Sequence, residues 1–583
     1  MKANMKKIFS AAMCMLLVLA TLAGCGSTAN QTESTSTAAV EQTTAQTTVA
    51  EKPIVELSMM QFDISVDDVE GMKNDRIKKF IEEKFRIKLK IVNPGDTATY
   101  HEKLNLYLSS GEAPDIIDDG LEPNFTTNAQ KEELLYDMGA AVARNPELYP
   151  VLNKLFADPM YKLTNQFKFG DSEKTFAIWS ISQLVNPWAG GVVYNGKIVK
   201  ELGLKLPTTV DEYVAMLREI KAKKPDVIPL GMRVDKGNLI GLLSPLFFRT
   251  YGVDILELTH DGKGSFTDTS TSDAAKQQWK LLQTLYKEGI IDKQVITNDT
   301  VAVVREKFIN GKYATFVSNG PGYHGLAVGD LYNELIKVNP SAKIGVDIMA
   351  DEAPLKGPAG VANLRLPIAD VAATNTVIYG NSKYPDRALE LLNYMLSNEG
   401  QDLKWFGIEG VHYTKNSDGT KKINRDEFFK DAQVYLPGET TRFEWTPFSD
   451  LTGQCYYQFE SYPTIAEAAN NTRNLIMESY LPAGEIGEYC NKVGIPFEDA
   501  VDLMPLYEFL STGAMSDEQK AIKAKVEDLK KKYYAAFLVG QKDVDKEWVN
   551  FVTEVKAAGC DDYAKAFTEA VAKNKAIYDK FVK

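Results

Sequence analysis

Glycine-rich and calcium-like motifs are the places where residue type and spacing in this chain first suggest chemistry. The run Gly320-Pro-Gly-Tyr-His-Gly325 fits G-x-G-x-x-G, in which glycines let the backbone approach a pyrophosphate. Pro321 removes a backbone donor that the phosphate would need, so we interpret the run as a turn after a strand at 314–318. The run Thr414-x-Asn416-x-Asp418-Gly419 resembles a calcium loop, but its first ligand is threonine and its twelfth position is Arg425. We expect a solvated hairpin turn there and no metal site.

Established catalytic patterns are missing from the sequence. It contains no H-E-x-x-H, G-x-S-x-G or Walker A motif, and its four histidines are scattered along the chain. Carboxylate pairs such as Asp118-Asp119 have the residue types that a glycosidase uses, and that alternative stays open. In so acidic a chain, however, we interpret such pairs as surface charge. We therefore expect a protein that is not an enzyme and that carries no cofactor.

Cys25 is the residue whose surroundings point most directly to a modification. Three lysines and an apolar run from Ile8 to Ala23 precede it, which is the pattern of a secretory signal peptide. The sequence Leu22-Ala-Gly-Cys25 resembles a bacterial lipobox, which implies that Cys25 becomes the lipidated, palmitate-bearing first residue. The run is short for a membrane-spanning helix. We predict a signal peptide at 1–24 and a lipid anchor on the extracellular face of the cell membrane.

Composition separates a tether from a folded body. Residues 25–52 are mostly Ser, Thr, Ala and Gln, which cannot bury enough apolar surface to offset the entropy of ordering. The rest is ordinary for a globular protein, with 44% hydrophobic and 25% charged residues overall. The net charge is −13, and loss of three lysines with the signal takes it to −16 (−13 less 3). Such charge disfavours nucleic acid and anionic lipid as partners.

Three cysteines remain in the body, namely Cys455, Cys490 and Cys560, and they are far apart in the sequence. Their spacing does not indicate a zinc site. An exported protein could pair two of them, and buried free thiols are an equal alternative.

The elements that would position a site follow an α/β order. We expect strands at 54–60, 87–92 and 115–118, with helices at 74–85 and 100–109 between them, by alternation and helical periodicity. Crossovers this short argue for a parallel sheet covered on both faces. Further helices are expected at 208–222, 272–288 and 384–397, and nearly the whole chain from Ser516 onward should be helical. Trp279 and Trp548 lie on amphipathic helices and are expected in the core.

Several sequence blocks along most of the chain carry a resemblance to a known family. They are EKLNLYLSSGEAPD (102–115), LGLKLPTTVDEY (202–213), LYKEGIID (285–292), FINGKYATF (308–316), GIEGVHY (407–413) and FLVG (537–540) with Trp548. In these blocks and their order the chain resembles the lipoprotein extracellular solute-binding proteins of bacterial ABC importers, in the large oligosaccharide-binding branch of Gram-positive bacteria. Two stretches depart from the family pattern, VYNG (193–196) and FAIW (176–179), so the ligand cannot be carried over from relatives.

The resemblance implies a type II periplasmic-binding-protein-like clamp, with two α/β lobes, hinge crossings and a helical C-terminal region. We expect 53–168 plus 305–368 to form the N-terminal lobe. The C-terminal lobe would comprise 169–304 plus 369–583. The crossings between lobes are expected near 166–176, 300–308 and 365–373.

Aromatic residues in segments of loop character are the expected ligand contacts. Sugars present C–H faces that stack on aromatic rings and hydroxyls that need carboxylates and amides. We predict Trp188, Tyr323, Trp405 and Trp445 as stacking platforms, with Asp115 and Glu409 as hydrogen-bond acceptors.

The function that this resemblance implies is a receptor, not a catalyst. We expect a lipid-anchored monomer that binds an oligosaccharide, neutral or weakly charged, and delivers it to the permease subunits of an ABC transporter. Two alternatives remain at this stage. One is a surface glycan-degrading enzyme, and the other is a ligand sensor that signals to a kinase.

Overall fold

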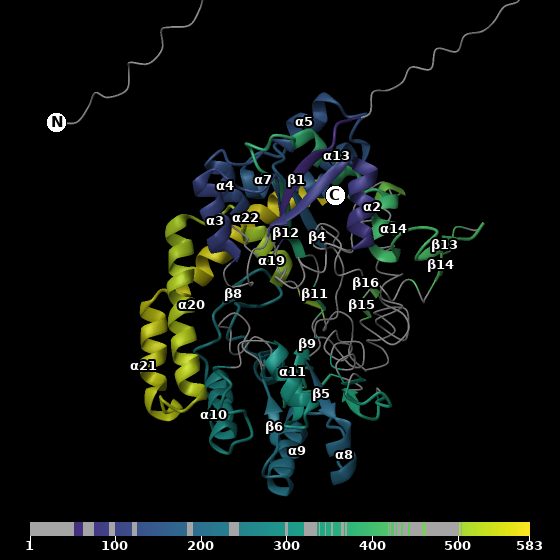
Figure 1. Cartoon of the computed structure of the whole chain (residues 1–583). Coiled ribbons are helices and arrows are strands. Elements are labelled where there is room, and N and C mark those ends of the chain that lie inside the picture. Colours follow the sequence, from purple (N-terminus) through teal and green to yellow (C-terminus); the bar gives the residue numbers. More distant parts are fainter. Residues whose placement is uncertain are drawn as a thin grey trace, which may run out of the picture. The chain divides into compact units, whose positions relative to one another are not determined.

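A computed structural model of the whole chain (Figure 1) defines the fold of the body that begins at Pro53. It describes residues 52–582 apart from 62–74, 93–99, 119–124, 183–189, 233–243, 298–300, 320–330, 332–334, 337, 344, 351–353, 359, 363–365, 368–369, 418, 420, 425–426, 428–432, 435–440, 443–458, 462–500 and 503. The predicted signal peptide, Cys25 and nearly all of the predicted tether lie outside the described residues.

The first sheet has five strands in the order β2-β1-β3-β12-β4. The strands β1 (Val55–Gln61), β2 (Ile87–Val92) and β3 (Ile116–Asp118) run parallel. The strand β12 (Asp370–Ile378) is antiparallel to both β3 and β4 (Ala177–Ser182), so the sheet is mixed. β2 is an edge strand, with Lys88 and Lys90 exposed and the alternate residues Ile87 and Leu89 buried.

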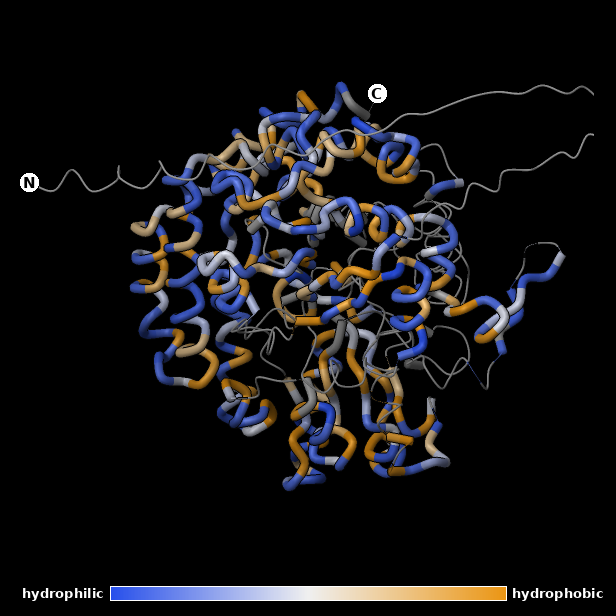
Figure 2. The backbone as a smooth tube through the Cα atoms, turned by 45° about the horizontal axis from the view of Figure 1, so that its top comes forward, coloured by the Kyte–Doolittle hydropathy of each residue, from blue (hydrophilic) through white to orange (hydrophobic). Residues whose placement is uncertain are grey.

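Helices with apolar faces cover this sheet and form the first core. α2 (Arg76–Phe85) begins at Asp75, whose side chain accepts a hydrogen bond from the Lys78 backbone, and it buries Ile77 and Ile81. Figure 2 shows hydrophobic and hydrophilic residues alternating along the helices, as an amphipathic pattern requires. The other helices of this core are α3 (Tyr100–Ser110), α5 (Met138–Arg144), α6 (Pro150–Ala157), α7 (Pro159–Phe169) and α13 (Pro385–Met395).

The second sheet has four strands in the order β10-β5-β9-β6. They are β10 (Ile348–Ala350), β5 (Gly190–Asn195), β9 (Tyr313–Asn319) and β6 (Ile228–Gly231), and only the β6–β9 pair is parallel. A side chain at Gly231 would bring Cβ within 2.3 Å of the Tyr313 ring, so only glycine allows these strands to meet there. The second core lies beneath α8 (Gly196–Leu202), α9 (Val210–Lys223) and α10 (Asp273–Lys287).

The C-terminal region is helical, as predicted. It consists of α19 (Met504–Ser511), α20 (Asp517–Leu538), α21 (Val544–Ala557) and α22 (Cys560–Val582). α19 and α22 contribute to the first core, whereas α20 and α21 contribute to the second. Trp279 and Trp548 are both buried in the second core, which confirms their predicted place. Among the described residues, no helix combines the length and apolar character needed to span a membrane.

Local signals predicted most of the early elements correctly. The expected strands and helices between residues 54 and 118 match β1 to β3 with α2 and α3, usually within two residues. The parallel pairing of β1, β2 and β3 is confirmed as well. The hairpin expected around 414–419 is present as β13 (Tyr413–Lys415) and β14 (Lys421–Ile423), which pair antiparallel.

Sheet membership corrects the predicted lobe boundaries. The range 305–368 was expected in the first lobe, but its strands β9 and β10 belong to the second sheet. The strands β4 and β12 were expected in the second lobe, but they pair with each other and with β3 in the first sheet. The reason is that β4 pairs with β12, which follows nearly two hundred residues later, and no local sequence pattern encodes that pairing.

The predicted crossings change accordingly. Residues 166–169 end α7, whose Phe167 lies in the first core, and β4 follows in the same sheet, so no crossing occurs there. Residues 301–308 form most of α11 (Val301–Ile309), which packs on β9 of the second sheet. The chain changes from the second sheet to the first between β10 and β12, and the crossing expected near 365–373 overlaps the end of that interval.

Candidate functional site

Buried polar residues lie in register where two parallel strands of the first sheet end. Gln61 is the last residue of β1 and Asp118 is the last of β3, and the two stand side by side in the ladder. Thr376 of β12 lies on the other side of Asp118. All three are buried. Ligands of open α/β sheets bind outside the carboxyl ends of the strands, so this row marks the candidate site.

Hydrogen bonds hold the Asp118 end of this row in place. The Tyr100 hydroxyl, on the first residue of α3, donates to the Asp118 carbonyl oxygen at 2.6 Å. The Thr376 hydroxyl donates to Asp118 Oδ1 at 3.1 Å. One residue earlier on β12, Asn375 Oδ1 accepts a hydrogen bond from the Thr126 hydroxyl at 2.5 Å. Helix α4 (Phe125–Lys131) supplies Thr126, so α3, α4 and β12 converge on the end of β3.

A hollow of about 510 Å³ lies between α3 and α4. His101 lines it, and the His101 ring lies with its centroid 5.1 Å from that of Tyr100, whose hydroxyl binds the Asp118 carbonyl. The side chains around it are an imidazole, two amides, a hydroxyl and a carboxylate, with leucines among them. The residues are His101, Asn105, Leu108, Ser109, Asn128, Ala129, Glu132 and Leu134.

Trp179 continues the site toward the next strand. It faces Asn375 in the β4–β12 register and is buried. Its indole Nε1 donates to Asn165 Oδ1 at 3.0 Å, and the Lys168 ammonium lies 5.4 Å from the ring centroid. Its partners are internal, so Trp179 supports the site from the core.

This arrangement suits recognition of a polar, uncharged ligand. Hydroxyls and amides both donate and accept hydrogen bonds, and carboxylates accept them, which is what a polyhydroxylated ligand needs. Within the described part of the chain, no group of three or more His, Cys, Asp and Glu side chains is placed to hold a metal ion. The segments that follow β1, β2 and β3, at 62–74, 93–99 and 119–124, are among the residues outside the description.

Asp115, a predicted ligand acceptor, lies at the opposite end of β3. Its Oδ2 accepts hydrogen bonds from the Ser58 backbone at 2.8 Å and from the Ser58 hydroxyl at 2.7 Å. Its Oδ1 accepts from the Ser382 hydroxyl at 2.7 Å. Both oxygens therefore join β1, β3 and the turn after β12, which favours a supporting role for this carboxylate.

Glu409, the other predicted acceptor, is exposed in the turn after α14 (Asn398–Phe406). Its Oε2 lies 3.4 Å from Lys415 Nζ, and the same ammonium lies 3.2 Å from Asp402. Burial lowers the pKa of Lys415, but hydrogen bonds with Asp402 and Glu409 outweigh that effect and raise the pKa overall. Asp115 binds Ser58 and Ser382 whereas Glu409 pairs with Lys415, so these contacts do not bring the two carboxylates together.

The predicted stacking residues remain predictions. Trp188, Tyr323 and Trp445 lie outside the described residues. Trp405 belongs to the last turn of the helix α14, which ends at Phe406, so it lies next to a loop and not within one.

Sequence reasoning missed the most buried members of the site. Asp118 was interpreted as surface charge, yet it is fully buried. Its place at the end of a predicted strand, like that of Gln61, was the signal that could have identified it. Asn375 and Thr376 had no such signal, because β12 was not predicted as a strand.

The chain is similar to known families and proteins. A family model described as bacterial extracellular solute-binding protein matches residues 73–402, more than half of the chain. A carbohydrate ABC transporter substrate-binding protein of Streptococcus pneumoniae serotype 4 is 23% identical over 76% of this chain and 79% of its own length. The fructooligosaccharide ABC transporter substrate-binding protein FusA of the same organism is also 23% identical, over 80% and 81%.

Solved structures agree on the fold. The alginate-binding protein AlgQ2 superimposes with a TM-score of 0.59 at 19% identity and covers 90% of this chain and 99% of its own. This chain therefore has the fold of the type II solute-binding proteins, built from the mixed sheets and the helical C-terminal region described above. Because the family model matches more than half of the chain, the chain belongs to the bacterial extracellular solute-binding proteins.

Proposed function

We propose that this protein is a membrane-tethered receptor that captures an oligosaccharide outside the cell and delivers it to the permease of an ABC transporter. The observation that carries the proposal is the family match over residues 73–402. Its relatives are named as carbohydrate and fructooligosaccharide substrate-binding proteins, which supports a sugar as the ligand. A glycan-degrading enzyme is not favoured, because these relatives are binding proteins.

The residues that we propose for ligand binding come from two sources. The buried row of Gln61, Asp118 and Thr376 would supply hydrogen bonds to sugar hydroxyls at the end of the first sheet. Trp188, Tyr323, Trp405 and Trp445 would supply stacking surfaces, and Glu409 an exposed acceptor, as the sequence predicts. Asp115 would hold the strands that carry the row.

Anchoring completes the proposal. Cys25 would carry the lipid, residues 26–52 would act as a flexible tether, and the body from Pro53 would work on the extracellular face as a monomer. The acidic charge of the mature chain makes a neutral or weakly charged oligosaccharide the expected ligand.

A glycan panel tests the function. The mature chain is incubated with neutral and acidic oligosaccharides, thermal shift reports binding, and chromatography of the supernatant reports products. Binding of at least one oligosaccharide with no product is the expected result. Product release would support an enzyme instead, and binding of none of the panel would contradict the sugar assignment. A kinase gene in place of permease genes beside its own would favour the sensor alternative.

A further inference from the structure

The C-terminal helices contribute side chains to both hydrophobic cores and so connect them. α20 contributes Val526 and Tyr534 to the second core, while α22 contributes Phe567 and Val571 to the first. The family model ends at residue 402, so these helices lie beyond the matched part of the chain.

The segment 253–266 also passes from the second core to the first. Ile255 belongs to the second core, and Leu258 and Phe266 belong to the first. Two anchors hold this segment against the C-terminal helices. The Tyr534 hydroxyl donates to the Ile255 carbonyl at 2.8 Å, and the Phe266 ring meets the Phe567 ring with centroids 4.8 Å apart.

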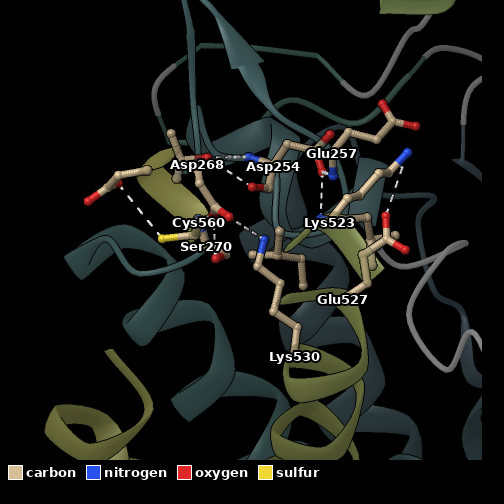
Figure 3. A network of polar contacts seen from close by, with 12 residues as sticks. Asp254, Glu257, Asp268, Ser270, Lys523, Glu527, Lys530 and Cys560 are labelled. Carbon is tan, nitrogen blue, oxygen red and sulfur yellow. Dashed lines mark hydrogen bonds and ion pairs between the residues drawn. The ribbon is translucent and has the colours of Figure 1, made fainter. Parts of the chain in front are cut away.

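Charged side chains occupy the place where these segments pass between the cores (Figure 3). Lys530 Nζ of α20 lies 2.6 Å from Asp268 Oδ2, and the two side chains are only 8% and 1% exposed. Asp268 Oδ1 accepts a hydrogen bond from the Ser270 backbone at 3.0 Å and another from the Ser270 hydroxyl. This ion pair is therefore buried, its carboxylate is oriented by Ser270, and it joins α20 to the segment that precedes α10.

A second group of charged side chains lies next to this ion pair. Arg249 makes ion pairs with Asp254 at 2.5 Å and with Glu257 at 2.6 Å. Figure 3 shows Asp254 and Glu257 beside Asp268, with Lys523 and Glu527 of α20 facing them. We call the set of Arg249, Asp254, Glu257, Asp268, Lys523, Glu527 and Lys530 the polar seam.

Lys523 ties the polar seam to α22. Burial lowers the pKa of Lys523, but Tyr563 of α22 together with Glu508 and Glu527 outweighs this and raises the pKa, so the ammonium stays charged. Cys560, the first residue of α22, is buried beside Asp268, and burial followed by the charge of Asp268 raises the pKa of its thiol to about 12. The thiol is therefore neutral at physiological pH and adds no charge to the seam.

A small hollow of about 30 Å³ lies within the polar seam, bordered by Glu257, Asp268, Lys523, Glu527 and Lys530. That volume is enough for about one water molecule. It leaves little space in which the charged groups could exchange partners.

We propose that the polar seam is the fixed pivot of a hinged clamp, an inference that rests on the proposed ligand-closing function. Apolar side chains of the same size would stabilise such a junction at least as well as a buried ion pair. The buried pair Lys530–Asp268, in contrast to an apolar contact, holds only one relative placement of its partners, because a shift of a few ångströms leaves both charges buried and uncompensated. The polar seam would therefore keep its distances while the two sheets rotate about it.

The experiment measures the spread of inter-core distances in the ligand-free mature chain. Clickable unnatural residues at Asn153 on α6 and Ala215 on α9, both exposed, carry fluorophores without using the cysteines. Single-molecule energy transfer then compares the parent chain with Asp268→Asn and Lys530→Met. The matched control is Lys532→Met, which breaks an exposed ion pair of the same helix, Lys532–Asp528 at 2.6 Å.

In the two seam variants the distance distribution should broaden and gain a longer component, while Lys532→Met should match the parent. Amide exchange in the first turn of α22 should also become faster, by about tenfold or more, in the seam variants. Unchanged distance distributions in folded seam variants would overturn the pivot, even if their melting temperatures fall. If Lys530→Met does not fold, Asp268→Asn, which keeps the side-chain shape, decides alone. No sugar is needed, so failure of the glycan panel and failure of the pivot remain distinguishable.

Discussion

At the level of single residues, Asp118 offers the sharpest test of the site. Asp118→Asn keeps the side-chain shape but removes the charge that would accept hydrogen bonds from ligand hydroxyls. A hydrogen bond to a charged group contributes about 1–1.5 kcal/mol more than one to the neutral amide oxygen that remains, so affinity should fall about fivefold to tenfold. Calorimetric titration with a sugar that binds in the panel measures the change.

The matched control for that substitution is Asp115→Asn, three residues earlier on the same strand. Its oxygens accept hydrogen bonds from Ser58 and Ser382, so the change should lower the melting temperature and leave the affinity nearly unchanged. If Asp115→Asn weakens binding and Asp118→Asn does not, the sequence-based choice of Asp115 as the ligand acceptor is the right one.

Tryptophan substitutions separate stacking from core packing. Loss of an aromatic platform removes about 0.5–1.5 kcal/mol beyond its area, to which lost apolar burial adds about 25 cal/mol per Å². Trp188→Ala and Trp405→Ala should therefore weaken sugar binding by at least about tenfold while the fold survives.

Trp548 provides the contrast. It is buried in the second core, with its ring centroid 5.1 Å from that of Phe551. Trp548→Ala should lower the melting temperature and change the affinity little. Titration and thermal unfolding of the three variants test both statements. If all three behave like Trp548→Ala, the predicted stacking residues are wrong even though the family is right.

At the level of elements, α9 shows how completely a local signal can define a helix. The Thr209 hydroxyl accepts from the Glu212 backbone, and the Glu212 carboxylate accepts from the Thr209 backbone, which forms a capping box. Thr209→Ala should cost about 1 kcal/mol of unfolding free energy, whereas Thr209→Ser should cost little because the cap remains. Urea titration of both variants makes the comparison, and equal midpoints for them would refute the cap.

The same element explains why part of the fold could be predicted and part could not. The cap and periodicity of α9, like the alternation in β2, are written within a dozen consecutive residues. The pairing of β12 with β3 and β4 depends on residues that are far away in the sequence, so β12 was taken as a crossing and the lobe boundaries followed it. Asn375 and Thr376 were lost from the predicted site for the same reason.

At the level of the whole molecule, hinge closure has a measurable size. A clamp that buries its ligand between two units should become more compact when the ligand binds. Small-angle scattering at saturating sugar should show a smaller radius of gyration than the ligand-free chain. An oligosaccharide that fails to bind in the panel, at the same concentration, serves as the control, and identical profiles with the binding sugar would contradict the clamp.

The anchor is tested on living cells. Cys25 supplies the thiol at the predicted cleavage site, so Cys25→Ser should abolish lipid attachment and leave unprocessed or shed protein. Cys14→Ser is the matched control, since Cys14 would leave with the signal peptide. Metabolic labelling with a fatty-acid analogue should mark the parent and the control alone. Equal label on Cys25→Ser would refute the lipoprotein assignment.

The edge strand β2 has a consequence for copies of the molecule that are crowded on one surface. In the described part of the chain no strand pairs with its outer edge, where Glu82 accepts a hydrogen bond from the Leu89 N–H, and in a dense layer such an edge could template the addition of a strand from a neighbour. Lys88 and Lys90 stand exposed along that strand, and two such edges brought together would place ammonium groups against one another. The lysines thus oppose fibre-like association and keep each copy separate at high surface density.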